Sequence, residues 1–222
     1  MTVEPGRRAR AKSDKRERIL TAARAVFAET GVDAATTARI ASLAGISHGT
    51  LFLYAATKGE LVLMAGNAAV AAAIRVGVEA AARQRDPREC ISALLRPLVA
   101  EPGAIAFLAA YQRHLLDPAG AGEHLEAALA LVRETELALT TILTAAWTGP
   151  SPAPSASDAA RAIAAVIDVE LLRAGRTGAG AEHFVAEVLA QADVIVRGYL
   201  TTAAPRTAHP HGAPNPEGQT SP

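Results

Sequence analysis

The sequence predicts an all-α protein, with a small N-terminal head of three helices that includes a helix-turn-helix and a larger C-terminal helical body, about nine helices in all. Alanine, the strongest helix former, recurs along the whole chain. Apolar residues return at steps of three and four, and glycine and proline mark the breaks between these periodic segments. A chain of 222 residues, 50% of them hydrophobic, is long enough for one sizeable domain or two small ones.

The composition argues against a secreted or membrane-embedded protein. Cys90 is the single cysteine, which excludes an intrachain disulfide framework. No run of about eighteen uncharged apolar residues could span a bilayer, and no apolar segment follows the basic start as it would in a secretory signal. We therefore expect a cytoplasmic protein without a membrane partner.

The net charge of zero conceals an uneven distribution of charge. Residues 1–60 carry ten Lys and Arg against six Asp and Glu, so the rest of the chain carries twelve against sixteen. Seven of the basic residues lie from Arg7 to Arg18, and we expect residues 1–14 to be a flexible basic arm. Such a cluster attracts phosphate backbones through counterion release, although charged tails also serve as solubilising segments.

Three helices follow the arm, each bounded by a glycine stop or by a serine or threonine cap. Because the second and third are short and a glycine separates them, they favour a helix-turn-helix. We expect the three helices from Asp14 to Gly31, from Thr36 or Thr37 to Gly45, and over residues 48–55 after Ser47.

The residues around the glycine turn fit this motif. Two helices that cross closely need a small residue at the crossing and positive φ in the turn, and Ala41 and Gly45 meet these needs. The inward residues would pack against Val26 and Phe27: Ile40, Ala44, Ile46 and Leu51. The outward residues would face a major groove: Ser42, Ser47, His48, Thr50 and Leu53.

About a fifth of the chain resembles a known family. The segment ILTAARAVFAETGVDAATTARIASLAGISHGTLFLYAATKGEL is similar to the N-terminal domain of TetR/AcrR-type transcriptional regulators. The resemblance implies a helical homodimer in which a DNA-binding head precedes a body for ligand binding and dimerisation. We accordingly expect the head over residues 15–60, the body over residues 61–202 and a disordered tail over residues 203–222.

The resemblance also implies roles for individual residues of the head. Thr37 and Lys58 would contact phosphates, and the recognition helix would begin with residues 47–50. Phe52 replaces a usual tyrosine, and Ala55 replaces a bulky phenylalanine of the head's core. Tyr54 would touch a phosphate or the wall of the groove, and core packing is its alternative role. The expected DNA-contacting set is Thr36, Thr37, Ser47, His48, Gly49, Thr50, Phe52, Leu53, Tyr54 and Lys58.

The sequence of the body predicts helices along almost its whole length. Pro87 suits a first helical turn, and the prolines and serines of residues 148–157 indicate a loop. We expect helices over residues 58–83, 87–99, 103–116, 123–147, 158–174 and 181–202.

The last two helices carry apolar stripes wider than one neighbouring helix needs, which favours association. The resemblance implies that they pair with their symmetry mates in a C2 dimer. Such a dimer reads a palindromic operator whose half-sites lie roughly 34 to 36 Å apart, or a multiple of that. The expected interface residues are Val166, Val169, Leu172, Val188 and Ile195.

The body has few bulky residues, so we expect its middle helices to enclose an apolar cavity for a small-molecule effector. Ordinary core packing is the alternative for its apolar candidates, and a surface position is the alternative for its histidine. The expected lining residues are Met64, Phe107, Tyr111, His114 and Trp147, with Arg75, Gln112 and Arg113 as polar anchors.

Three function classes remain at this stage. The first is a repressor released from its operator by a small apolar or amphipathic molecule. The second is a DNA-binding regulator controlled by a protein partner or by no effector, and the third is a helical enzyme or carrier with a vestigial head. Two observations oppose the third class. No motif places Cys90 and His114 close enough to act as a nucleophile and its base, and the histidines are too scattered to form a metal site. We expect no catalytic residue, cofactor or metal.

Overall fold

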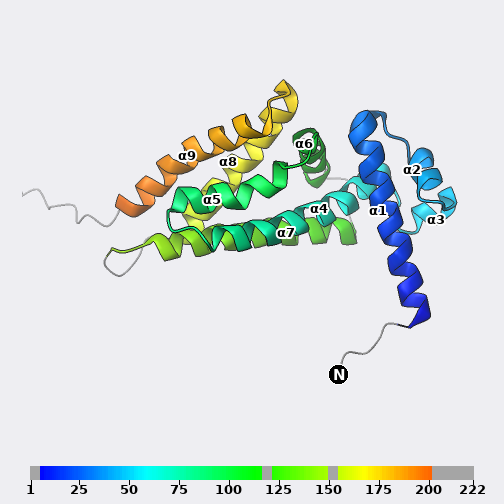
Figure 1. Ribbon diagram of the computed structural model, residues 1–222, viewed down its shortest axis with the longest axis horizontal. Helices are drawn as coiled ribbons and strands as arrows, with labels where there is room; N and C mark the ends of the chain where they lie inside the picture. The colour runs from blue at the N-terminus through cyan, green and yellow to red at the C-terminus, as the bar shows by residue number, and fades with distance from the viewer. Residues whose placement is uncertain (1–5, 117–121, 150–154, 202–222) are drawn as a thin grey trace, which may run out of the picture.

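The computed structural model describes residues 6–116, 122–149 and 155–201. These residues form nine α-helices and one short 3-10 helix, η1, with no strand among them, so the all-α prediction is confirmed (Figure 1). The head holds α1 (Arg7–Ala34), α2 (Thr37–Leu43) and α3 (His48–Phe52). The body holds α4 (Lys58–Ala81), α5 (Pro87–Leu95), η1 (Arg96–Val99), α6 (Ala104–Leu115), α7 (Glu123–Ala146), α8 (Ala156–Thr177) and α9 (Ala181–Thr201).

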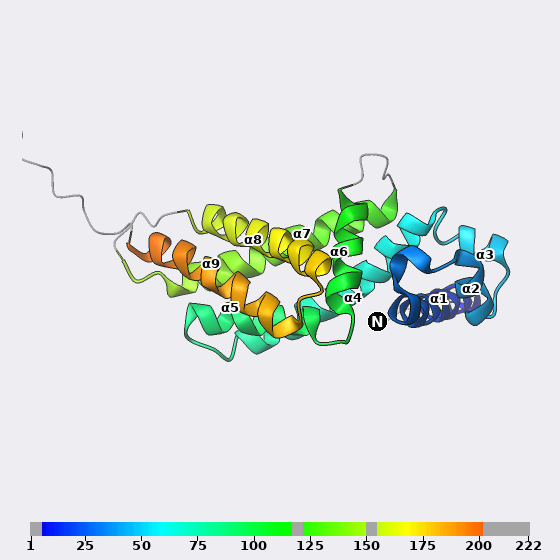
Figure 2. The same ribbon diagram turned by 90° about the horizontal axis from the view of Figure 1, so that it is seen from above.

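The head lies at one end of an elongated molecule, and α4 runs from it into the body (Figure 1). α5, α7, α8 and α9 form the far part of the body. α6 crosses between this part and the head, as both views show (Figures 1 and 2). α6 contacts α1, α4 and α8, and therefore joins the head to the body a second time.

The first helix begins at Arg7, which corrects the expectation of a flexible arm as far as residue 14. Gly6 is its N-cap residue, and arginine, alanine and lysine are good helix formers, so nothing in residues 7–14 interrupts the helix. About two turns of α1 therefore project past α2 and α3 (Figure 1). At the other end, Gly31 has φ 75° and breaks the helix as predicted, before one further turn that ends at Ala34.

α4 is the central helix of the molecule. The Thr57 side chain accepts a hydrogen bond from Glu60 N at 3.1 Å, and the Glu60 carboxylate accepts one from Ala56 N at 2.6 Å, which fixes where α4 begins. By length and composition α4 could cross a membrane, but half of its apolar window is buried in the protein. Because it packs against α1, α5, α6 and α7, its apolar character is explained by its place in the core.

The hydrophobic core of the head continues into α4. The cluster that contains Ile19, Ile40 and Leu51 also contains residues 61–65, past the boundary expected at residue 60. Farther along, α4 approaches α5 so closely that a Cβ on Gly77 would lie 2.6 Å from the carbonyl oxygen of Leu94. The second core cluster joins η1 and helices α5 to α9.

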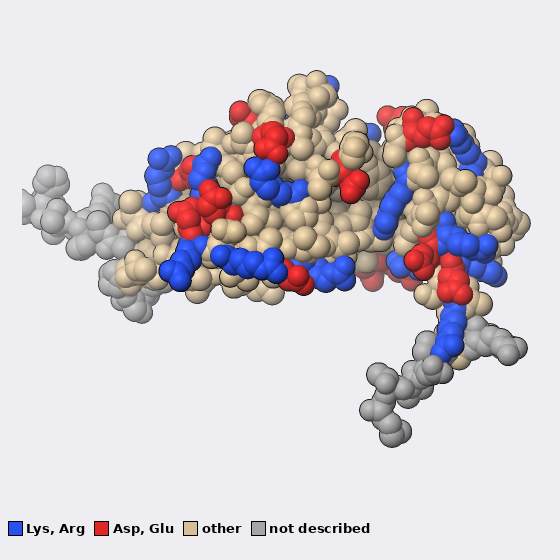
Figure 3. Space-filling view, in the orientation of Figure 1, with Lys and Arg blue, Asp and Glu red and all other residues tan. Residues whose placement is uncertain are grey.

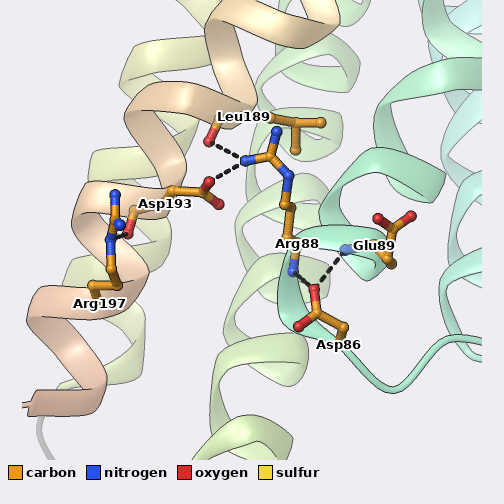
Figure 4. Close-up of polar contacts among 6 residues, drawn as sticks. All are labelled: Asp86, Arg88, Glu89, Leu189, Asp193 and Arg197. Carbon is orange, nitrogen blue, oxygen red and sulfur yellow. Dashed lines mark hydrogen bonds and ion pairs between the residues drawn. The ribbon is translucent and has the colours of Figure 1, made fainter.

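Polar contacts join α5 to α9 on the surface of the body (Figure 4). The Asp86 carboxylate caps α5, since Oδ1 accepts hydrogen bonds from Arg88 N at 2.9 Å and Glu89 N at 3.2 Å. The Arg88 guanidinium donates to Leu189 O at 3.4 Å and pairs with the Asp193 carboxylate. The N-terminal turn of α5 is thereby held against the middle of α9.

The body helices lie close to their expected bounds. η1 replaces the last turn of the segment expected as one helix over residues 87–99. α8 begins earlier than expected, at Ala156, because the Ser155 side chain accepts a hydrogen bond from Asp158 N at 3.2 Å. The tail over residues 203–222 and residues 150–154 of the loop expected over residues 148–157 lie outside the described residues.

One residue of the expected dimer interface is corrected. Val188 has 0% exposure and belongs to the core of this chain, because the α9 face that also carries Phe184 and Ala192 packs inward. Val169 is exposed on α8. The other three candidates are half-buried: Val166, Leu172 and Ile195.

Candidate DNA-binding and effector sites

Local hydrogen bonds form the helix-turn-helix. The Thr36 side chain caps α2 by accepting from Arg39 N at 3.3 Å, and the Ser47 side chain caps α3 by accepting from Thr50 N at 3.1 Å. Gly45 lies between them with φ 64°, a conformation that glycine adopts without strain. The expected inward residues are buried, except for a half-buried Ile46: Ile40, Ala44 and Leu51.

The outer face of α3 is exposed and internally ordered. His48 Nε2 is hydrogen-bonded to Thr37 Oγ1 at 2.9 Å, and its ring meets the edge of the Phe52 ring at 4.6 Å between centroids. Leu53, just after α3, has 84% exposure. α2 and α3 thus present a face of short polar side chains and two apolar ones, a suitable chemistry for base edges and thymine methyl groups.

The two expected phosphate contacts at the end of the head already have partners. The Tyr54 hydroxyl donates to Lys12 O at 3.4 Å, and the half-buried Tyr54 ring packs against the head's core. The Lys58 ammonium donates to Asp33 O at 2.7 Å and keeps further N–H groups for a phosphate. Basic side chains also lie on the projecting part of α1, with acidic ones between them (Figure 3).

The body contains a small cavity, which we call the body cavity, between α4, η1, α6, α7 and α8. Its volume is about 90 Å³, and most of its lining is aliphatic. Burial raises the pKa of Tyr111 to about 12. The polar residues of the lining are Tyr111, Gln112, Thr135 and Asp168.

Asp168 combines solvent access with a raised pKa. Its side chain is exposed in the single chain, yet protein atoms surround it on its other sides. Burial among these atoms is the main cause that raises the pKa of Asp168 to about 6. The hydrogen bond from Gln112 opposes this rise, and the nearby charge of Glu136 adds to it. The carboxylate is therefore mostly ionised at neutral pH.

A larger cavity of about 920 Å³, the junction cavity, lies between the end of α1, α4, the segment after η1 and α6. In its wall the rings of Phe27 and Phe107 stack at 5.6 Å between centroids, which joins α1 to α6. The junction cavity and the body cavity share three lining residues: Val70, Leu98 and Leu108. The two cavities are therefore neighbours.

A chain of hydrogen bonds, which we call the buried polar chain, leads from the body cavity to the head. The Tyr111 hydroxyl donates to Asn67 Oδ1, and Asn67 Nδ2 donates to His124 O, both at 2.8 Å. His124 Nε2 then donates to Tyr54 O, also at 2.8 Å. Asn67, Tyr111 and His124 are buried, so each lost bond would leave a polar group without water as a substitute.

Comparison with known proteins decides the family. The model for bacterial regulatory proteins of the tetR family matches residues 19–65, which include the helix-turn-helix. The head of this chain therefore matches the tetR family of bacterial regulatory proteins. Three solved structures share the fold of this chain. A transcriptional regulator from Rhodococcus sp. Rha1 has a TM-score of 0.63 and 23% identity, over 82% of this chain and 96% of that one. A TetR transcription regulator from Haloarcula marismortui has a TM-score of 0.62 and 19% identity, over 85% and 99% of the two chains, and Thermus thermophilus FadR, a TetR-family repressor in complex with lauroyl-CoA, has a TM-score of 0.59 and 23% identity, over 91% and 100%.

The structure separates the ligand-binding residues expected from the sequence. Tyr111 lines the body cavity and Phe107 lines the junction cavity. Met64 is packed in the core, the Trp147 ring contacts that of Tyr199 at 5.5 Å, and half-buried His114 packs against Gly59. Neither of the two described cavities includes these three residues, so their contact with a ligand stays a prediction.

Chemistry at Cys90 finds little support in the same fold. The thiol is buried, donates to Ala81 O at 3.6 Å, and has a raised pKa because of its burial, so it is held as a neutral thiol. Within the part of the chain that the structure describes, no group of three or more His, Cys, Asp or Glu side chains could hold a metal ion.

Sequence reasoning missed several residues at these sites. Asn67 is the one polar residue in the apolar run over residues 61–74 of α4, and that isolation was the available signal. No pattern in the sequence distinguishes His124 or Asp168 from the residues around it. Nothing in the spacing of Tyr54, Asn67 and His124 indicates that the fold brings them together.

Proposed function

We propose that this TetR-family regulator is a non-enzymatic cytoplasmic repressor that binds a palindromic operator as a homodimer. A small apolar or amphipathic effector in the body would release it from DNA. The head over residues 15–60 would contact DNA through the exposed face of α2 and α3, with Thr37 and Lys58 on phosphates. The body over residues 61–202 would bind the effector and the partner subunit.

The buried polar chain is the observation that carries the effector part of this proposal. A ligand in the body cavity contacts Tyr111, and three hydrogen bonds lead from Tyr111 to the backbone of Tyr54, two residues after α3. A ligand that shifts Tyr111 therefore also shifts the segment that follows the recognition helix. A tenfold loss of operator affinity requires a coupling free energy of only about 1.4 kcal/mol.

The relatives support an effector of this general kind. Thermus thermophilus FadR, whose fold is similar, was solved with lauroyl-CoA. The junction cavity of about 920 Å³ is large enough for a ligand of ordinary size and lies directly against the end of α1.

The exposed apolar side chains of the last two helices support the dimer. Val169 on α8 and Val194 on α9 are both exposed in the single chain. With Val166, Leu172 and Ile195 half-buried beside them, they form an apolar surface that a second copy would cover.

Binding of the purified protein to the intergenic DNA upstream of its own gene tests the proposal. Fluorescence anisotropy would be recorded across a salt series, with a scrambled duplex as control. We expect saturable binding of two chains per site and a preference for the upstream duplex. Equal affinity for both duplexes that vanishes with modest salt would contradict sequence-specific binding, because it would reduce the interaction to phosphate contacts.

A regulator without a small-molecule effector is the second candidate. The volume of the body cavity, about 90 Å³, favours it, because ligand pockets usually measure about 300 to 1,000 Å³. A ligand screen with operator release as the readout separates the two candidates. Release by any small molecule at constant salt supports the first.

A further inference from the structure

The body cavity has an unsatisfied polar end. Gln112 has 7% exposure, and its Nε2 donates to the Asp168 carboxylate. Within the described residues, its Oε1 is buried and has no hydrogen-bond partner. Because a buried acceptor without a donor costs free energy, this atom indicates a donor that the chain itself does not supply.

The charge of this end is also uncompensated. Asp168 is the one charged residue among the 16 described residues that line the cavity, and no lysine, arginine or histidine is among them. Glu136 lies close enough to raise the pKa of Asp168, which adds a second acidic group to the surroundings. A carboxylate in mostly apolar surroundings gains most from a cation that also donates hydrogen bonds.

We infer that the effector is an amphipathic organic cation whose protonated amine binds between the Asp168 carboxylate and Gln112 Oε1. An ammonium group has several N–H donors and can satisfy both acceptors at once. An effector that placed a carboxylate or a phosphate at this position, as an acyl-CoA could, would be repelled by the negative charge of Asp168. This inference rests on the proposed function in one respect, that the body cavity is the effector site.

The cavity also restricts the apolar part of such an effector. About 90 Å³ leaves little room for a bulky body beside the ammonium group. The wall shared with the junction cavity consists of the movable side chains of Val70, Leu98 and Leu108. A narrow alkyl chain fits this arrangement best, because it can pass between these side chains toward α1.

Direct titration of the full-length protein with matched probes tests the inference. Octylamine, octanol and octanoate share one alkyl chain and differ in the charge of the head group. Isothermal titration calorimetry without DNA should show octylamine binding about tenfold more tightly than octanol, and octanoate binding more weakly than both. Equal affinities for the three probes, or no octylamine binding, would overturn the inference.

Variants assign the preference to this site. Asp168→Asn should remove the preference for octylamine over octanol, whereas Asp158→Asn, the same change on an exposed part of α8, should retain it. Gln112→Leu should weaken octylamine several-fold and provides an independent check if Asp168→Asn does not fold. A preference that persists in both cavity variants would place the amine elsewhere and overturn the inference.

Operator binding separates this inference from the proposed function. If octylamine binds as expected but the protein does not recognise its upstream DNA, the cation site holds and the repressor proposal fails. If the protein binds its operator but octanoate binds as tightly as octylamine, the repressor proposal holds and the cation site is wrong.

Discussion

The head and the body organise their polar groups in different ways. In the head the caps that begin the helices join near neighbours in the chain, such as Ser47 with Thr50 and Thr57 with Glu60, each three residues apart. In the body the bonds of the buried polar chain join residues that are 44, 57 and 70 positions apart. The face proposed to contact DNA is thus built by short segments, whereas the proposed link to the effector exists only once the whole body is packed.

This difference predicts how each region responds to substitution. A local cap can be lost while the rest of the head stays folded, because each cap serves one helix end. A buried hydrogen bond in the body is lost together with the packing around it. Its loss should therefore lower the free energy of unfolding more and disturb more of the structure than the loss of a cap.

The largest loss of stability is expected when a crowded glycine is replaced by alanine, and the same change at a glycine in open space is its control. In Gly77→Ala the new Cβ would meet the backbone of Leu94 at 2.6 Å, so α4 and α5 must separate. We expect the free energy of unfolding to fall by about 3 kcal/mol in urea denaturation. In Gly49→Ala the Cβ meets nothing within 4 Å, so stability should be unchanged or slightly higher. Equal losses in the two variants would contradict the comparison.

Loss of the middle of the buried polar chain should come next. Asn67→Leu leaves the Tyr111 hydroxyl without its acceptor and removes the side-chain donor to the His124 carbonyl, at a cost of about 2 kcal/mol. The variant should bind its operator but release it less in response to the effector. Gln84→Leu, an exposed change just after α4, is the control for stability. An unchanged effector response in Asn67→Leu would show that the coupling does not use this chain.

Two serine caps of the same kind separate the roles of head and body. Ser47→Ala at α3 and Ser155→Ala at α8 should each lower the free energy of unfolding by about 1 kcal/mol, because each removes one side-chain acceptor. Operator affinity, measured by anisotropy, should fall only for Ser47→Ala. An equal loss of affinity in both would mean that DNA binding responds to overall stability.

The smallest effect concerns the pH dependence of stability. Burial raises the pKa of Asp168 in the folded chain from 3.8 to about 6, so the folded state binds the proton more tightly than the unfolded state. This group therefore contributes stability below its unfolded pKa, and the contribution is lost as the pH rises through about 6. Asp168→Asn should make the melting temperature depend less on pH between 3.8 and about 6, and should raise it slightly at neutral pH. A profile identical to that of the natural chain would contradict the assignment.

The head was largely predictable from sequence because its signals are local. The caps at Thr36, Ser47 and Thr57 and the glycine stops at Gly31 and Gly45 each depend on a few adjacent residues. The start of α1 was missed because a run of charges was read as an arm, although such residues also form helices.

The site residues of the body were harder to predict, because the sequence does not show whether an apolar residue faces the core, a cavity or a partner. Val188 looked like an interface residue, yet the fold turns that side of α9 inward. Trp147 and Met64 looked like cavity residues for their size, whereas they pack against other side chains. Asn67 and His124 acquired their roles only when helices distant in the chain came together.

Two of the acceptors in the buried polar chain are main-chain carbonyls, those of Tyr54 and His124. Every amino acid supplies a carbonyl, so a change of side chain at position 54 leaves the acceptor in place. The side chains proposed to contact the operator can therefore change, during evolution or by design, without loss of the hydrogen bond between Tyr54 O and the body. A head with a new DNA preference could inherit the old ligand response unchanged.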